Sequence, residues 1–427
     1  MNLVTPPGFR DVLAEEAVAR EGITRAVQGL FAERGYLPIE TPTLEVMDVM
    51  QAGGRMPGSS FKFFDSRGDL LAMRPDVTLQ VARMCATRLS GQPGPFRFRY
   101  TQRVFREAAL DAQASAREVT QIGVECIGEQ GPAADAEVVS LLAEALRIGG
   151  VGAFTLSIAT VGVLRSLLDR SGAPAAWRRA VLDAYHASDF VELDRLTALD
   201  GAAGVDVSGI APAYAEAVRN LVRTRGRREA IDAVRAMVAP LGCTDGLDDF
   251  ERTYDALVAE GLEDRIVVDF SVMSSFDYYT GIVFEAYSPY GGAALGSGGR
   301  YDRMIGAYGT DRPAAGFAFS LEDAMAAAAA EEACAHAGTP VAPAGRSLRV
   351  AVPKGSLNPD AIACLASAGL DVTGLDNPGR QLIISVPGVD FIIVRPSDAP
   401  AFVASGAADC GICGKDSLLE ADLGVVE

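Results

Sequence analysis

The residues most able to do chemistry lie in two short segments, an Asp-Tyr-Tyr run within residues 276–285 and a Gly-Gly-Arg-Tyr-Asp run at residues 298–302. Tyrosine rings form apolar walls with a polar rim, which suits a pocket for a small polar ligand. Core packing of the tyrosines is the alternative, because tyrosine is common on half-buried strands. We expect Arg300 and Asp302 either to support such a pocket or to form a structural ion pair.

Two glycine-rich stretches do not match the loops that hold nucleotides. Residues 296–299 fail the dinucleotide-binding pattern at its third glycine and predict a tight turn beside the pocket. Residues 411–415 end in Gly-Lys but lack the earlier glycine and the following Ser or Thr of a P-loop. Neither stretch therefore predicts a nucleotide site.

Several segments resemble the signature motifs of class II histidyl-tRNA synthetases. Residues 276–285 resemble the histidine-binding motif of this family and residues 316–323 its third motif. Upstream, in the same order as in the family, come the first motif with its dimer-forming helix and strand, two strands of the second motif and the strand after it, at residues 35–45, 71–78, 98–107 and 121–125. Matches in the right order are more specific than any one of them. The resemblance implies an antiparallel sheet flanked by helices and self-association as a dimer.

The resemblance also implies a histidine pocket. The family holds the amino acid with acidic, hydroxyl and amide side chains and with the tyrosine pair, and those positions are occupied here by Asp76, Thr78, Gln121, Glu125, Tyr278 and Tyr279. Carboxylate and amide oxygens accept hydrogen bonds from an ammonium and an imidazole N–H, which suits this ligand. Asp76 stands where the family has glutamate and shortens the reach by a methylene. Arg106 is the nearest candidate for the ligand's carboxylate.

The cations that adenylate formation needs are depleted. That reaction neutralises a carboxylate and a triphosphate at once, so it requires several converging guanidinium groups. By the resemblance, Arg106 is retained, but Ala108 replaces a glutamate and Ser274 and Asp323 replace arginines. An anion in place of a phosphate-facing cation reverses a Coulomb interaction on the order of several kcal/mol. We therefore expect no ATP-dependent aminoacylation and no catalytic residue in this chain.

A synthetase core that keeps part of its histidine pocket but loses its chemistry is typical of the regulatory subunit of ATP phosphoribosyltransferase. The chain resembles that family through about residue 335 and begins in its manner at residues 5–11. The resemblance implies a non-catalytic subunit that binds the short-form catalytic subunit, is required for the first step of L-histidine biosynthesis and transmits feedback inhibition by histidine. It implies no cofactor.

The C-terminal part resembles a different protein, the beginning of the catalytic subunit of the same enzyme. Residues 336–347 are rich in glycine and proline and predict a linker, and residues 348–427 predict a partial α/β lobe of the periplasmic-binding-protein type. The phosphate-cradling loop of the catalytic subunit is absent from this stretch, and Ser356 stands where that family has a basic residue. We expect no transferase activity from the chain alone.

Two other functions stay open at this stage. The chain could be a histidyl-tRNA synthetase, although Ser274 and Asp323 argue against it. It could also be a fragment of a fused regulatory and catalytic ATP phosphoribosyltransferase, because both resemblances occur in one sequence. Histidine-dependent pyrophosphate exchange would identify the first, and the genomic sequence after Glu427 would identify the second.

Composition limits the partners and the compartment. The formal charge of −18 over 427 residues disfavours binding to nucleic-acid phosphates. Seven cysteines, no signal-type N-terminus and no apolar run of about 18 residues predict a reduced cytoplasmic setting and no membrane association. Cys410 and Cys413 have the spacing of a metal or redox pair, but they fall on a predicted buried strand. With only His186 and His336 as histidines, we expect no metal site.

Periodicity places these segments on an α+β fold. Apolar residues at helical spacing predict helices at residues 13–34 and 133–148. Strands are expected at residues 154–158, 266–270 and 281–286. Residues 160–260 combine helical periodicity with few β-branched runs, which predicts an all-helical insertion in the antiparallel sheet.

Overall fold

The computed structural model describes residues 5–53, 60–107, 116–201, 204–272, 278–336, 348–354, 358–375, 383–404, 407–414 and 417. The chain forms two compact units, Met1–Ala333 and Cys334–Glu427. The predicted linker lies outside the described residues beyond position 336.

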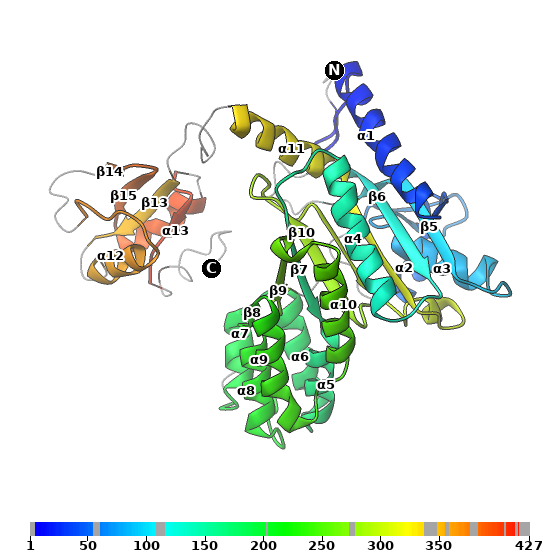
Figure 1. Cartoon of the computed structure of the whole chain (residues 1–427). Coiled ribbons are helices and arrows are strands. Elements are labelled where there is room, and N and C mark those ends of the chain that lie inside the picture. Colours follow the sequence, from blue (N-terminus) through cyan, green and yellow to red (C-terminus); the bar gives the residue numbers. More distant parts are fainter. Residues whose placement is uncertain are drawn as a thin grey trace. The chain divides into compact units, whose positions relative to one another are not determined.

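A nine-stranded sheet forms the centre of the first unit (Figure 1). Its strands in spatial order are β1 (Leu37–Pro38), β5 (Phe96–Phe105), β6 (Glu118–Ile127), β12 (Ala314–Ser320), β11 (Gly296–Arg300), β10 (Ile282–Tyr287), β7 (Thr155–Thr160), β9 (Ile266–Asp269) and β8 (Arg225–Gly226). The pairs β1–β5 and β7–β9 are parallel and the other six described pairs are antiparallel. The predicted fold class is confirmed, but residues 296–299 belong to strand β11 and do not form the expected tight turn.

Two helices, α1 (Ala14–Glu33) and α4 (Pro132–Ile148), cover one face of this sheet, which we call the helical face, and α11 (Leu321–His336) follows β12 directly. Apolar side chains hold α1 and α4 there. The Phe31 ring of α1 meets the Phe317 ring of β12 edge-on, with centroids 5.9 Å apart. Phe317 pairs with Val124 in β6, and paired residues of antiparallel strands point to the same side. The even-numbered residues of β6 therefore face the helices, and the odd-numbered ones, including Gln121 and Glu125, face the opposite side, the open face.

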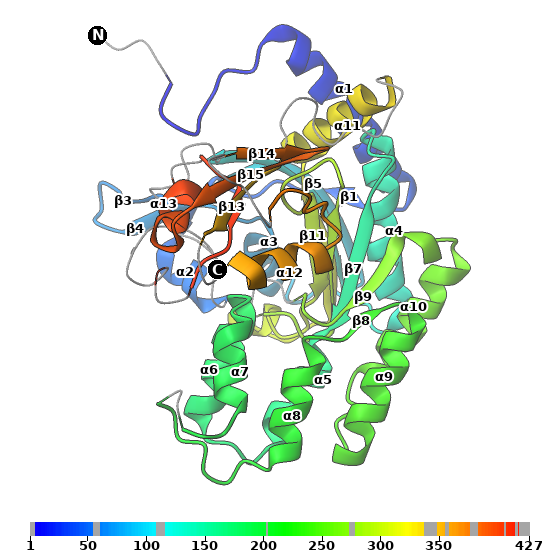
Figure 2. The same cartoon turned by 90° about the vertical axis from the view of Figure 1, so that its left-hand side faces the viewer.

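The predicted helical insertion lies between β7 and β9. It contains α5 (Val161–Arg170), α6 (Ala175–His186), α7 (Phe190–Thr197), α8 (Pro212–Leu221), α9 (Arg228–Val238) and α10 (Leu247–Ala259), with 3₁₀ turns η1 (Ala239–Leu241) and η2 (Glu263–Arg265). Figure 2 shows α5–α9 grouped beyond one end of the sheet. One expectation was wrong: the insertion is not wholly helical, because β8 pairs with β9 at the sheet edge.

A smaller three-stranded sheet lies beside the N-terminal strands. It has the order β2 (Leu44–Val46), β4 (Leu70–Met73) and β3 (Lys62–Phe64), with helices α2 (Met47–Ala52) and α3 (Thr78–Arg88) and the 3₁₀ turn η3 (Ile305–Tyr308) next to it. Strand β4 ends just before Asp76 and Thr78. The small sheet therefore carries the turn that leads into α3.

The second unit has its own core around a four-stranded sheet. It contains β13 (Leu348–Pro353), α12 (Asn358–Ser367), β14 (Ile383–Val386), β15 (Val389–Val394), the 3₁₀ turn η4 (Pro396–Asp398), α13 (Ala399–Ala404) and β16 (Cys410–Gly411). The order is β14-β15-β13-β16, with β13 parallel to both β15 and β16. The strand at Cys410 is exposed, contrary to our expectation of burial, because it has a single neighbour at the sheet edge.

Gly298 sets the spacing of two central strands. A Cβ added there would lie closer than 3.0 Å to the Gly316 carbonyl and to the ring of Phe284, its cross-strand partner. We expect Gly298→Ala to lower the free energy of unfolding of the first unit by about 2 kcal/mol. Gly22→Ala in α1 is the control, because that position is exposed and a Cβ there meets nothing within 4 Å. It should raise stability by up to about 1 kcal/mol. Urea unfolding followed by circular dichroism compares them, and equal effects would contradict this role of Gly298.

Candidate functional site

A small cavity lies on the open face of the sheet, where β6, β11 and β12 meet the turn before α3. Its volume is about 30 Å³. The described residues that line it are Asp76, Thr78, Gln121, Glu125, Tyr278, Tyr279, Ser297, Tyr301, Gly316, Phe317 and Ala318. This volume holds one or two water molecules and is too small for an amino acid. Six of the predicted pocket residues thus meet at one cavity.

Glu125 is the central group of this cavity. Its side chain has 0% exposure and accepts hydrogen bonds from Thr78 Oγ1 at 2.7 Å, from Tyr100 Oη at 3.3 Å and from the Tyr301 hydroxyl. Burial raises the pKa of Glu125 to about 8, although the three hydroxyl donors act in the opposite direction. Glu125 is therefore a carboxyl group that exchanges its proton near neutral pH.

Gly316 makes room for this carboxyl group. It is the cross-strand partner of Glu125 in β12, and a Cβ added there would collide with Glu125 Oε2 and with the Val124 carbonyl. The side chain of Glu125 can lie flat across β12 only because residue 316 has no side chain.

Buried hydrogen bonds hold the Asp76–Thr78 turn against the sheet. Asp76 Oδ1 accepts from the Thr78 backbone N–H at 2.7 Å, where α3 begins. The adjacent Arg74 is 6% exposed and donates to the carbonyl oxygens of Thr41 at 2.7 Å and Arg103 at 2.7 Å. Its pKa is lowered by desolvation.

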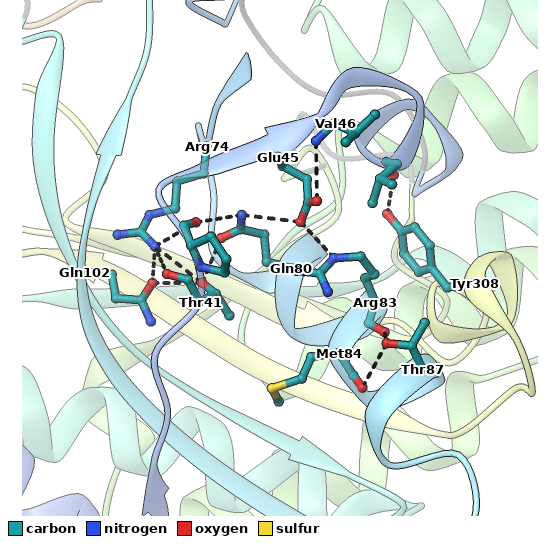
Figure 3. A network of polar contacts seen from close by, with 12 residues as sticks. Thr41, Glu45, Val46, Arg74, Gln80, Arg83, Met84, Thr87, Gln102 and Tyr308 are labelled. Atoms are coloured by element: carbon teal, nitrogen blue, oxygen red, sulfur yellow. Dashed lines mark hydrogen bonds and ion pairs between the residues drawn. The ribbon is translucent and has the colours of Figure 1, made fainter. Parts of the chain in front are cut away.

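Figure 3 shows how Arg74 joins the first-motif segment to β5. Its guanidinium also bonds the Gln102 side chain, and Gln80 donates to the Pro42 carbonyl at 2.8 Å. Glu45 in turn forms an ion pair with Arg83 at 2.7 Å. These contacts fix the start of α3, and with it Thr78, at the cavity.

Gln121 and the tyrosines complete the lining. Gln121 is 7% exposed, and its Oε1 has no hydrogen-bond partner in the part of the chain that the structure describes. The rings of Tyr278 and Tyr279 lie 4.7 Å apart, and Tyr278 meets Tyr301 edge-on at 5.9 Å. Burial raises the pKa of both Tyr278 and Tyr279, so these phenols stay neutral. The cavity thus offers a vacant acceptor, two carboxyl groups and aromatic walls, which suits a ligand with N–H donors.

The other predicted site residues do not line the cavity. Arg106 is exposed, and its Nε donates to the Pro75 carbonyl at 3.1 Å. Arg300 is buried and bonds Asp135 at 2.7 Å and Asp302 at 3.0 Å, while Asp302 accepts from the Ala314 backbone N–H. Arg300 and Asp302 therefore form an ion pair with each other and further contacts with residues that do not line the cavity. None of the described lining residues is basic.

Of the three substituted positions, the structure describes only Asp323. This residue is exposed, and its backbone N–H donates to Ser320 Oγ at 3.1 Å, so Ser320 caps the start of α11. A carboxylate in the first turn of a helix is favoured by the helix dipole. Ala108 and Ser274 lie outside the described residues.

Sequence reasoning missed Tyr100, Ser297 and Tyr301 as members of the site. Tyr301 lies within the Gly-Gly-Arg-Tyr-Asp run, two positions after Gly299. Residues two positions apart on a strand point to the same face, so this spacing predicts that Tyr301 shares the face of Gly299. Tyr100 and Ser297 carry no such local signal. They become neighbours of Glu125 only through the pairing of β5, β6, β12 and β11.

No group of three or more His, Cys, Asp or Glu side chains among the described residues is placed to hold a metal ion, and Cys85, Cys126, Cys243 and Cys410 are free thiols. Within the same ranges, no helix has the length and apolar content that crossing a bilayer requires.

Comparison with known proteins relates the chain to a synthetase-like family. The sequence model of the family described as histidyl-tRNA synthetase matches residues 8–324. A protein of Desulforamulus reducens named ATP phosphoribosyltransferase regulatory subunit is 34% identical over 321 residues, which are 75% of this chain and 78% of that protein. A protein of Moorella thermoacetica with the same name is 35% identical over 322 residues, 75% of this chain and 80% of that protein.

Solved structures share the fold. A crystal structure from Bacillus halodurans, titled as an ATP phosphoribosyltransferase regulatory subunit/histidyl-tRNA synthetase, has a TM-score of 0.69 and 24% identity and covers 97% of this chain and 98% of its own. A histidine–tRNA ligase subunit from Alicyclobacillus acidocaldarius has a TM-score of 0.60 and 29% identity and covers 78% of this chain and 99% of its own.

The pKa of Glu125 predicts how stability depends on pH. In the folded chain this group keeps its proton up to about pH 8, whereas an ordinary glutamate loses it near 4.5. Between these values the folded state binds more protons than the unfolded state, so stability falls as pH rises. Relative to Glu125→Gln, which has no proton to lose, the wild type should lose about 1 kcal/mol per pH unit between pH 5.5 and 7.5. Urea unfolding at several pH values measures this, and parallel profiles for the two proteins would refute it.

Proposed function

Because the chain belongs to the family of ATP phosphoribosyltransferase regulatory subunits, built on the histidyl-tRNA synthetase fold, we propose that it is the non-catalytic regulatory subunit of that enzyme. In this function it joins the short-form catalytic subunit in the first step of L-histidine biosynthesis and has no activity by itself. The observation that carries the proposal is the cavity around Glu125, which offers acceptors and hydroxyl groups but, among its described lining residues, no cation.

Free histidine is the ligand that we propose for this cavity. Glu125 would accept from the imidazole N–H, and Asp76 with the vacant Gln121 Oε1 would accept from the ammonium group. Arg106 lies next to this turn through its bond to the Pro75 carbonyl and would face the ligand's carboxylate. The cavity of about 30 Å³ must widen to admit the ligand, so histidine would bind a second arrangement of the core.

Feedback follows from that second arrangement. A ligand changes an equilibrium only through its differential affinity for the two states. Histidine would favour the widened cavity, and contacts between subunits would transmit the change to the catalytic partner. This assigns the regulatory role to the same site that a synthetase uses for substrate.

We also propose that the chain dimerises through its synthetase-like core. Exposed apolar side chains occur on the N-terminal strands, with Phe64 71% and Leu37 65% exposed. Leu44 and Val46 of β2 and Phe63 of β3 extend this set. An exposed apolar group of this kind is typical of a protein interface.

The second unit has a separate place in the proposal. Residues 336–347 would link it to the core, and residues 348–427 would form a partial lobe like the start of the catalytic subunit. Its parallel pairing of β13 with β15 and β16 supports an α/β lobe. The fused-fragment alternative shares this feature, so the regulatory role rests on the first unit.

Mixing experiments test the function directly. We expect the full chain to raise the turnover of a short-form ATP phosphoribosyltransferase catalytic subunit by at least about tenfold, and millimolar histidine to reverse most of that gain. The measurement is phosphoribosyl-ATP formation with and without the chain and with and without histidine. No effect on turnover together with no co-elution would contradict the proposal. Histidine-dependent pyrophosphate exchange by the chain would favour the synthetase alternative.

Calorimetry tests the ligand. Glu125→Ala should weaken histidine binding on the order of 10- to 100-fold, because a buried hydrogen-bond acceptor for the ligand is lost. Glu118→Ala is the matched control, since Glu118 lies on the same strand but points to the helical face. Glu125→Gln keeps the shape of the side chain if the alanine variant is unstable. Equal affinities for the wild type and both Glu125 variants would remove Glu125 from the site.

A further inference from the structure

A second and larger hollow opens on the first unit, between the sheet and the helical insertion. Its volume is about 780 Å³, and strands β10, β7, β9 and β8 contribute its lining together with the α6–α7 connection. Ser157, Glu285 and Tyr287 line it from β7 and β10, Asp269 and Arg225 from β9 and β8, and Phe190 from the start of α7. We call this hollow the insertion groove.

The groove lies on the same open face of the sheet as the Glu125 cavity. Ser297 lines the cavity, and its cross-strand partner Glu285 lines the groove. Ser157 is in turn the partner of Glu285 on β7. Paired residues of antiparallel strands point to the same side, so cavity and groove are neighbouring parts of one surface.

Charge in the groove favours a cation. Arg225 Nε lies 3.4 Å from Asp269 Oδ2, so these two charges offset each other. The Glu285 carboxylate accepts from the Tyr287 hydroxyl, which leaves its negative charge in place, and Arg225 and His186 are the basic residues among the described lining residues. The whole chain carries a formal charge of −18, which adds a long-range attraction for basic partners.

Two aromatic side chains line the groove, and the Tyr287 hydroxyl bonds the Glu285 carboxylate. Tyr287 is 38% exposed and Phe190 is 41% exposed, although both line the groove. Most of the remaining lining carries hydroxyl groups, from Ser157, Ser271 and Ser288 among others. A pocket for a small apolar ligand is lined mainly by apolar and aromatic side chains. The hydrogen-bonding groups and exposed aromatic side chains of this groove instead suit a polypeptide segment.

We infer that the insertion groove docks an extended segment of the catalytic subunit, placing an arginine side chain against Glu285 and Tyr287. The inference rests on the proposed function, since it names the surface through which that partner binds. A planar guanidinium forms paired hydrogen bonds with a carboxylate and stacks on an aromatic ring, and a lysine ammonium does only the first in part. Because Glu285 and Ser297 are paired, a partner held at Glu285 would respond to the width of the neighbouring cavity.

Charge reversal tests the groove. The affinity of the full chain for the short-form catalytic subunit is measured by calorimetry for the wild type, Glu285→Gln and Glu285→Lys. We expect about a tenfold loss for the glutamine variant and 30-fold or more for the lysine variant. Glu216→Lys is the matched control, an exposed glutamate of α8 outside the groove lining, and should stay within about twofold. Melting temperatures and histidine binding equal to wild type establish that each variant is folded.

A compensating change identifies the partner group. Arginine-to-glutamate substitutions in the catalytic subunit are paired with Glu285→Lys, and one of them should restore affinity by at least about tenfold. Undiminished binding by folded Glu285→Lys overturns the inference while leaving the proposed function intact. Sedimentation in which Glu285→Lys disrupts only self-association also overturns it, because the groove would then hold a second copy of the chain. If the wild type fails to bind or activate the catalytic subunit, the proposed function falls and the inference falls with it.

Discussion

A carboxyl group buried on strand β6 of the sheet constrains the whole open face. Glu125 has no solvent contact, and a buried carboxylate is costly unless it is protonated or well hydrogen-bonded. Three hydroxyl donors meet that demand, from Thr78 on α3, Tyr100 on β5 and Tyr301 after β11. These donors are brought together by the pairing of β5, β6, β12 and β11 and by the start of α3. Each of these elements must keep its position for the buried carboxyl group to be tolerated. Gly316 also helps to accommodate the buried carboxyl group, because it leaves the space that the Glu125 side chain fills.

Electrostatics separates binding from catalysis on this surface. A cavity lined by carboxyl, hydroxyl and amide groups, with no cation among its described residues, offers acceptors to an ammonium or an N–H donor and no positive charge to a phosphate. Arginines are present nearby, but Arg74 is occupied by carbonyl oxygens and Arg300 by Asp135 and Asp302. Asp323, where the resembling family has a nucleotide-binding arginine, stabilises the start of α11. The residues that remain suit recognition of an amino acid without activation of its carboxylate.

Sequence patterns predicted the long helices and strands but not the residues that strand pairing brings together. The helices at 13–34 and 133–148 and the strands near 154, 266 and 281 were predicted correctly, because long apolar periodicity survives in a single sequence. Strand β8 was missed because two residues carry no periodicity and form a strand only by pairing with β9. The resemblance to a known family brought six cavity residues together in advance, yet it gave no sign of Tyr100 or Ser297. Those two depend on cross-strand register, which links positions more than 20 residues apart without any local pattern.

The small volume of the cavity bears on how a sensor of this kind would work. A site that already fitted histidine would bind it without any change in the core and could report nothing to a partner. The described cavity of about 30 Å³ is smaller than histidine, so in the proposed function the ligand would bind a widened arrangement of the core. The free energy of widening weakens the apparent affinity for histidine, but it is the same free energy that distinguishes the two arrangements. In the proposed function, Ser297 and Glu285 are the residues through which that difference reaches the adjoining groove, because one strand pair carries both.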